Sequence, residues 1–266
     1  MKFFIAQRKP FSKRRKIALG VLTLAAIYLV YNLVRARVLL RNGAHVGKVA
    51  QTFPRNYFVG DSSSPTVIYL SLGDSTAAGW GAHDATQTFA FKIASSLAHS
   101  GFRVHVVNFA VGGATLRDVI EYQLPKLQTV RPQLVTISVG ANDATRGTHL
   151  NEYSNDLQRL QKALKNSTAR QVLWANTPDM TQTPAPPMLL SKLFGFRARR
   201  QNAMLNIVVT NEKIAVINLH DDGKLIYAND RELYASDLFH PSAKGYTVWS
   251  KLFIEQLRTE KIVSEK

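Results

Sequence analysis

The stretch that decides the fold is Thr66-Val67-Ile68-Tyr69-Leu70-Ser71-Leu72, followed at once by Gly73-Asp74-Ser75-Thr76. The first seven residues are mostly β-branched or apolar and are bounded by Pro65 and Gly73, which predicts a buried strand. A short glycine-punctuated segment follows, and then a helical pattern begins. Ser75 is therefore expected at the carboxyl edge of a sheet, where open α/β folds place their chemistry. We interpret Ser75 as a nucleophile.

Strands and helices alternate along the rest of the chain. Further strands are predicted at 103–111, 133–139, 171–175 and 214–219, and helices at 88–98, 116–130, 151–165, 197–212 and 243–259. This alternation predicts an α/β fold with a three-layer, flavodoxin-like parallel sheet of order 2-1-3-4-5. In that order the ends of strands 2, 1 and 3 lie side by side. These ends carry Gly113, Ser75 and Asn142, so three loops are expected to meet in one crevice.

The absence of cysteine and the net charge limit which kinds of site and partner the protein can have. The 266 residues contain no cysteine, which excludes disulfides, thiolate zinc sites and cysteine nucleophiles. The net charge of +16 is uneven, because residues 1–34 carry +7 without an acid and the remainder carries +9. The basic balance favours an anionic surface such as lipid headgroups or an acidic polymer. No nucleic-acid-binding motif accompanies it, so a nucleic-acid partner is not expected.

The amino-terminal segment has the features of a membrane anchor. Residues 17–34 are uncharged and span roughly 27 Å as a helix, enough to cross a hydrocarbon core. A buried core helix and a cleaved signal peptide are the alternatives. We expect a basic cytoplasmic tail at 1–16, a transmembrane signal anchor at 17–34, a juxtamembrane linker at 35–60 and the folded domain at 61–266. The larger cationic cluster precedes the span, which predicts a single-pass protein with an extracytoplasmic domain.

The closing segment Asp237-Leu238-Phe239-His240-Pro241 supplies what a nucleophilic serine needs. An acid three residues before a histidine on a turn can orient the imidazole, which leaves its other nitrogen free to face Ser75. The developing oxyanion requires N–H donors, and the backbone of Ser75 and Gly113 with the side-chain amide of Asn142 can provide them.

The residues resemble the SGNH hydrolases, also called GDSL-type esterases and lipases. The resemblance rests on four blocks in order over roughly residues 66–258, with Thr76 in place of a frequent leucine. The blocks are Gly73-Asp74-Ser75, Asn108-Phe109-Ala110-Val111-Gly112-Gly113-Ala114-Thr115, Gly140-Ala141-Asn142-Asp143 and Asp237-Leu238-Phe239-His240-Pro241. The resemblance implies ester hydrolysis through an acyl-enzyme, with Ser75, Asp237 and His240 catalytic and Ser75, Gly113 and Asn142 forming the oxyanion hole. It implies no metal and no organic cofactor.

Other polar residues have plainer interpretations. Asp74 adjoins Ser75 on a turn and is expected to hold the loop through hydrogen bonds. Asp143 is expected to be structural, and His220 with its two following acids is expected in a solvated loop rather than around a metal ion. The segment 178–196 is either a lid with an acyl-chain surface or a loop with a short helix.

Two substrate classes remain open at this point, together with one alternative to catalysis. The substrates are lipid or lysophospholipid esters, or O-acetyl groups on a surface glycan. The alternative is a catalytically idle module of the same fold that binds an anionic ligand or partner.

Overall fold

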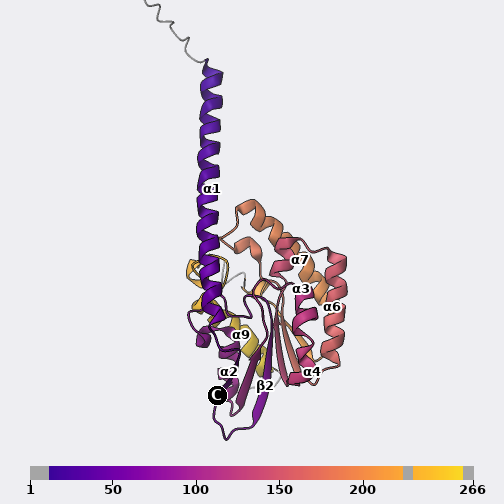
Figure 1. Cartoon of the computed structure of the whole chain (residues 1–266). Helices are drawn as coiled ribbons and strands as arrows, with labels where there is room; N and C mark the ends of the chain where they lie inside the picture. Colours follow the sequence, from indigo (N-terminus) through magenta and orange to yellow (C-terminus); the bar gives the residue numbers. More distant parts are fainter. Residues whose placement is uncertain (1–11, 224–229, 260–266) are drawn as a thin grey trace, which may run out of the picture. The chain divides into compact units, whose positions relative to one another are not determined.

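The structure is a computed structural model that describes residues 12–223 and 230–259 (Figure 1). The chain divides into two units, one ending at Val38 and a compact one from Leu39 onward. The elements, in chain order, are α1 Lys13–Gln51, β1 Asn56–Val59, β2 Thr66–Gly73, η1 Ala85–Gln87, α2 Phe89–His99, β3 Arg103–Asn108, α3 Leu116–Asp118, the π-helix η2 Val119–Gln123, α4 Lys126–Val130, β4 Leu134–Ser138, α5 Ala141–Arg146, α6 Leu150–Lys165, β5 Gln171–Ala175, η3 Met180–Gln182, α7 Met188–Val208, β6 Ile214–Ile217, η4 Arg231–Leu233 and α9 Ala243–Thr259.

The first unit contains the beginning of helix α1. Its apolar side chains from Ile17 to Val34 are exposed along the helix. Within the described part of the chain, α1 is the one helix that is long and apolar enough to cross a membrane, a property that signal sequences share. Of the expected basic tail at 1–16, residues 1–11 lie outside the described residues.

The second unit is built on a six-stranded sheet of order β1-β3-β2-β4-β5-β6. Strands β3, β2, β4, β5 and β6 are parallel, which confirms the predicted order 2-1-3-4-5. Strand β1 adds an antiparallel edge next to β3. The central strands are apolar on both faces because helices cover both sides of the sheet.

Helices lie on both faces of the sheet (Figure 1), and each helical layer encloses its own apolar core. Helices α2 and α9 cover one face, where Ile93, Trp249 and Phe253 pack on the sheet. Helices α3, α4, α6 and α7 cover the other face, where Leu157 and Leu205 are buried. This three-layer arrangement covers both faces of the sheet, and the loops at its carboxyl edge carry the predicted site.

Three segments differ from the sequence-based expectations. The expected linker at 35–60 is instead helical up to Gln51 and contains β1, so the compact unit starts before residue 61. The expected helix at 116–130 is interrupted by a π-helix, because Pro125 has no N–H to continue the helical pattern. The stretch 178–196 contains the turn η3 and the first turns of the 21-residue helix α7.

Candidate active site

The loops after β2, β3 and β4 leave the sheet at one edge and are hydrogen-bonded to each other. Gly73 ends β2 at a φ of +140°, and a Cβ atom there would lie 2.0 Å from the carbonyl oxygen of Ser138. Only glycine therefore allows the chain to turn this close to β4. The N–H of Asp74 donates to Ser138 O at 2.9 Å, and that of Val111 donates to Gly73 O at 3.1 Å.

The predicted catalytic residues come together at this edge. His240 Nε2 lies 2.8 Å from Ser75 Oγ, and His240 Nδ1 lies 2.6 Å from Asp237 Oδ2. All three residues are buried, with exposed fractions of 7% for Ser75, 3% for Asp237 and 7% for His240. The structure thus joins residues 165 positions apart in the chain into one continuous hydrogen-bonded series.

The local turn explains how Asp237 and His240 come to face each other. Asp237 Oδ1 accepts hydrogen bonds from the backbone N–H groups of Phe239 and His240, both at 3.0 Å. Leu238, which follows Asp237, adopts a left-handed conformation with a φ of +56°, which is unfavourable for a branched side chain. The tight turn therefore brings the imidazole of His240, three positions after Asp237, back to the Asp237 carboxylate.

The charge on Asp237 determines which nitrogen of the imidazole acts as its hydrogen-bond donor. Burial raises the pKa of Asp237, but the His240 hydrogen bond and charge, with the two backbone donors, lower it below its usual value overall. Asp237 is therefore ionised at neutral pH and can only accept hydrogen bonds. His240 Nδ1 then carries the proton, and Nε2 is left to accept the hydroxyl proton of Ser75.

Gly113 and Asn142 are held beside each other by hydrogen bonds in the neighbouring loops. Asn142 Nδ2 donates to Ala114 O at 3.0 Å, and Arg146 Nη2 donates to Gly113 O at 2.8 Å. Gly113 has a φ of +83°. The carbonyl groups of Gly113 and Ala114 are thus held by side chains from α5, which fixes the turn that contains the N–H of Gly113. A rigid turn and a fixed side-chain amide are what an oxyanion site requires, because its donors then need no reorganisation during the reaction.

The two other acids of these blocks support the loops. Asp74 Oδ1 accepts from Thr76 N at 2.9 Å and Thr76 Oγ1 at 2.8 Å, as expected for a loop-holding residue. Burial raises its pKa. Asp143 accepts from Leu116 N at 2.9 Å and Thr148 Oγ1 at 3.1 Å, and burial raises its pKa to about 6. Asp143 therefore ties α5 to the start of α3.

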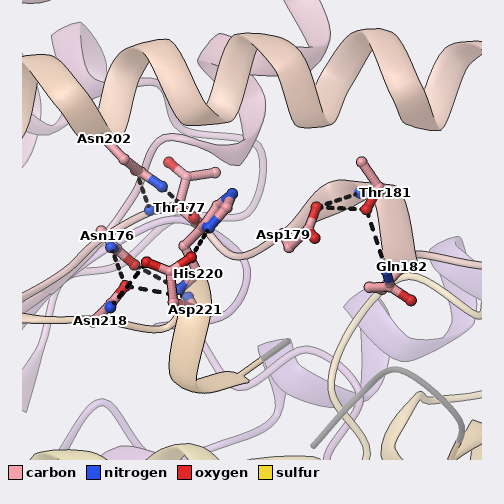
Figure 2. A network of polar contacts seen from close by, with 9 residues as sticks. All are labelled: Asn176, Thr177, Asp179, Thr181, Gln182, Asn202, Asn218, His220 and Asp221. Atoms are coloured by element: carbon pink, nitrogen blue, oxygen red, sulfur yellow. Dashed lines mark hydrogen bonds and ion pairs between the residues drawn. The ribbon is translucent and has the colours of Figure 1, made fainter. Parts of the chain in front are cut away.

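His220 lies in a separate polar network after β5 and β6 (Figure 2). Its Nδ1 is 2.8 Å from Asp221 Oδ1, and its backbone N–H donates to Asn176 Oδ1 at 2.9 Å. Asn176 also donates to Asn218 Oδ1 at 2.8 Å, which joins the ends of the two strands. The expected solvated loop is wrong for His220, which is 8% exposed, because this network draws it inward. Among residues 12–223 and 230–259, no group of three acids or histidines forms a metal site.

Trp80 is a site residue that the sequence motifs do not identify. Its ring centroid is 5.2 Å from that of His240, and its backbone carbonyl accepts from Tyr246 Oη at 2.6 Å. Added Cβ atoms at Gly47 and Gly112 would lie 2.7 and 2.2 Å from its ring atoms. Trp80 is therefore packed between two glycines that leave room for it. The two glycines that make room for Trp80 are visible in the sequence. They lie in other segments of the chain, however, so no local motif connects them with Trp80.

A small pocket opens next to the nucleophile loop. It encloses about 60 Å³ and is lined by residues that include Thr76, Met180, Phe239, Pro241 and Trp249. Thr76 follows Ser75, and Phe239 and Pro241 flank His240. The lining is mostly apolar, so the pocket suits a small apolar group better than a charged one.

A buried serine, histidine and aspartate in hydrogen-bonded series on a doubly wound sheet define a serine hydrolase. The sequence model of the GDSL-like Lipase/Acylhydrolase family matches residues 71–248. The chain belongs to this family and is a carboxylic ester hydrolase. The resemblance noted from the four sequence blocks is thereby confirmed.

Solved structures agree with this assignment at the level of the fold. The crystal structure of TesA has 21% sequence identity and a TM-score of 0.60, covering 72% of this chain and 98% of its own. Axe2, an acetylxylan esterase from Geobacillus stearothermophilus, has 16% identity and a TM-score of 0.54, with 78% and 99% covered. The lipase Lip_vut3 from a goat rumen metagenome has 19% identity and a TM-score of 0.53, with 70% and 95% covered. No curated protein sequence matches this chain.

Proposed function

We propose that this chain hydrolyses carboxylic esters through an acyl-enzyme formed on Ser75. The observation that carries the proposal is the pair of short contacts of His240, at 2.8 Å to Ser75 Oγ and 2.6 Å to Asp237 Oδ2. In this proposal His240 is the general base and acid, and Asp237 orients and stabilises the imidazolium. The N–H groups of Ser75 and Gly113 and the amide of Asn142 stabilise the oxyanion.

The reaction proceeds in two balanced steps. Ser75 Oγ attacks the ester carbonyl while its proton moves to His240 Nε2, and the carbonyl electrons move onto the oxygen. The tetrahedral intermediate collapses, the bond to the leaving oxygen breaks, and His240 gives that oxygen its proton. A water molecule then attacks the acyl carbon while its proton moves to His240 Nε2. The bond from the acyl carbon to Ser75 Oγ breaks and His240 returns the proton to Ser75 Oγ, which releases the acid and restores Ser75.

Two substrate classes have structural support. The pocket beside Thr76 encloses about 60 Å³, well below the roughly 150 Å³ cavity that binds benzene, which favours a short acyl group such as acetyl. The apolar amino-terminal helix and the exposed leucines at the start of α7 favour lipid esters. A glycan O-acetyl ester and a lipid or lysophospholipid ester therefore remain the two candidates.

The first experiment separates an enzyme from an idle binding module. A fluorophosphonate probe should label the parent chain, whereas Ser75→Ala should be neither labelled nor active on p-nitrophenyl acetate. Asn166→Ala, which changes a side chain at the end of α6 and outside the site, is the matched control. Unchanged ester turnover in Ser75→Ala would refute the assignment, and an unlabelled, inactive parent chain would favour the idle module.

The second experiment separates the substrate classes. A series of p-nitrophenyl esters of increasing acyl length should show a clear optimum in kcat/KM. An optimum at acetate supports the glycan O-acetyl class, and an optimum at long chains supports the lipid class. Both optima are compatible with Ser75 as the nucleophile, so this result is independent of the first.

We further propose that residues 17–34 anchor the protein in a membrane as a single span, with residues 1–16 in the cytoplasm and the hydrolase unit outside. The support is the 18-residue uncharged stretch with seven cations before it. The ester substrate would then lie at or beyond the outer surface of that membrane.

A further inference from the structure

The first turns of α7 expose an unusual amount of apolar surface. Met188 and Leu189 are 73% and 78% exposed, and Leu193 and Phe196 are 41% and 50% exposed. Leu189, Leu193 and Phe196 are spaced by four and three residues, so they share one face of the helix. The opposite face is buried through Ser191, Gly195 and Ala198. A contiguous exposed apolar face of this kind is typical of an interaction surface.

The charges carried by α7 itself are all of one sign. The 21 residues of α7 contain Lys192, Arg197, Arg199 and Arg200 and no acid. Lys192, Arg199 and Arg200 are exposed, and the guanidinium of Arg200 lies 5.8 Å from the ring centroid of Phe196. Cations beside exposed leucine and phenylalanine side chains are the pattern of helices that lie in the surface of an anionic bilayer.

A series of hydrogen bonds connects the start of α7 to the place where the chain enters the compact unit. Asn42 Nδ2 donates to Ser236 O at 2.7 Å, and Ala185 N donates to Leu238 O at 3.1 Å. The turn that holds Asp237 and His240 thus contacts both segments.

The length of the chain limits how far this turn can be from the proposed span. Asn42 follows Val34, the last residue of the apolar stretch, by eight positions. Eight residues reach at most about 29 Å even when fully extended. Whatever the arrangement of the two units, the start of α7 is therefore tethered close to any bilayer that residues 17–34 cross.

We propose that the exposed face formed by Leu189, Leu193 and Phe196, with Met188 at the exposed first position of the helix, inserts into the surface of the anionic bilayer in which the chain is anchored. This inference rests on the proposed membrane anchoring and adds a second contact to it. Lys192 and Arg199 bind the headgroups beside the inserted side chains. The contact holds the turn of Asp237 and His240 next to the lipid surface, so that ester groups at that surface are the nearest substrates.

The absence of cysteine allows a direct test on the full chain. Leu189→Cys and, as a control, Gln128→Cys on α4 each provide a single site for an environment-sensitive fluorophore. Gln128 is exposed and lies near the amino edge of the sheet, at the opposite end of the parallel strands. Both labelled proteins are reconstituted into phosphatidylcholine vesicles with and without phosphatidylglycerol, and quenching by acyl-chain-brominated lipid is measured.

We expect the label at position 189 to be quenched several-fold more than the label at position 128, and more so when phosphatidylglycerol is present. Adding Lys192→Gln and Arg199→Gln should reduce the dependence on phosphatidylglycerol. Equal quenching at the two positions, or shielding of position 189 from both lipid bromine and aqueous iodide, would overturn the inference. Flotation with the vesicles tests the anchor separately, and turnover of p-nitrophenyl acetate tests the hydrolase assignment.

Discussion

Asn142 is the residue whose contribution can be measured most directly. An amide nitrogen carries two hydrogens, and the hydrogen bond to Ala114 O uses one of them and fixes the orientation of the group. We predict that Asn142→Ala lowers kcat by about 10²–10³ with little change in KM, since the lost interaction stabilises mainly the transition state. Steady-state kinetics on p-nitrophenyl acetate would show this. A kcat within a few-fold of the parent value would remove Asn142 from the oxyanion site.

Asp143 makes the stability of the protein depend on pH. Burial raises its pKa from 3.8 to about 6, so the folded state holds this proton in a range where the unfolded state releases it. The contribution of this group to the free energy of unfolding is fully present below pH 4 and is lost as the pH rises to about 6. The loss is on the order of 2–3 kcal/mol.

The corresponding prediction concerns Asp143→Asn, which cannot ionise. Relative to the parent, the variant should become more stable by about 2–3 kcal/mol as the pH rises from 4 to 7. Urea unfolding in detergent at several pH values measures the difference. Asp237 and other groups away from Asp143 contribute alike to both proteins, whereas buried Asp74, whose charge acts on Asp143, is coupled to the change and belongs to the measured difference. A difference that is constant with pH would contradict the raised pKa.

At the scale of elements, the parallel strands could be predicted because each is a short apolar run that ends in glycine or a polar turn. Their alternation with helices predicts a parallel sheet, and the order 2-1-3-4-5 is the flavodoxin-like arrangement of such a sheet. Strand β1 could not be predicted in the same way, since Asn56–Val59 has only four residues and is stabilised by pairing with β3. The start of α7 was obscured by Pro184, Pro186 and Pro187, which precede it directly and indicate a loop.

The site could be predicted from sequence to the extent that its pattern is local. Asp237 and His240 are three residues apart, and Ser75 follows a recognisable strand. Trp80 and Arg146 could not be predicted, because their roles depend on contacts with Gly112 and Gly113 in another loop. Such contacts leave no periodic pattern in the sequence.

The last turns of helix α1 provide a matched pair of substitutions. A Cβ atom at Gly47 would lie 2.7 Å from the ring of Trp80, whereas one at Gly43 would lie 3.8 Å from Asp237 Oδ2, an ordinary contact. Alanine stabilises a helix relative to glycine by about 0.5–1 kcal/mol. We predict that Gly43→Ala is neutral or stabilising and leaves turnover unchanged.

Gly47→Ala should instead displace Trp80, which packs beside His240. We expect it to destabilise the protein by about 1–3 kcal/mol, as overpacking does, and to lower kcat severalfold. Urea unfolding and ester turnover, measured on both variants, test the pair. If the two variants behave alike, the last turns of α1 do not pack on Trp80 in solution.

At the scale of the whole molecule, the uneven charge and the apolar helix bear on the orientation of the chain. Residues 1–34 carry +7, but Arg35, Arg37 and Arg41 follow the apolar stretch closely. The positive-inside rule compares the cations on the two sides of a span, so the larger cluster is expected to stay in the cytoplasm. The hydrolase unit would then face the other side.

Single cysteines test this orientation, because the native chain has none. Ser63→Cys places a thiol in the exposed turn before β2, and Lys2→Cys places one in the basic tail. In right-side-out membrane vesicles, a membrane-impermeant maleimide should label position 63 at once and position 2 only after detergent is added. Inside-out vesicles should give the reverse. Labelling of position 2 but not of position 63 in right-side-out vesicles would place the hydrolase in the cytoplasm, because the cations after the span would then outweigh those before it. Labelling of both positions without detergent would mean that residues 17–34 do not cross the membrane.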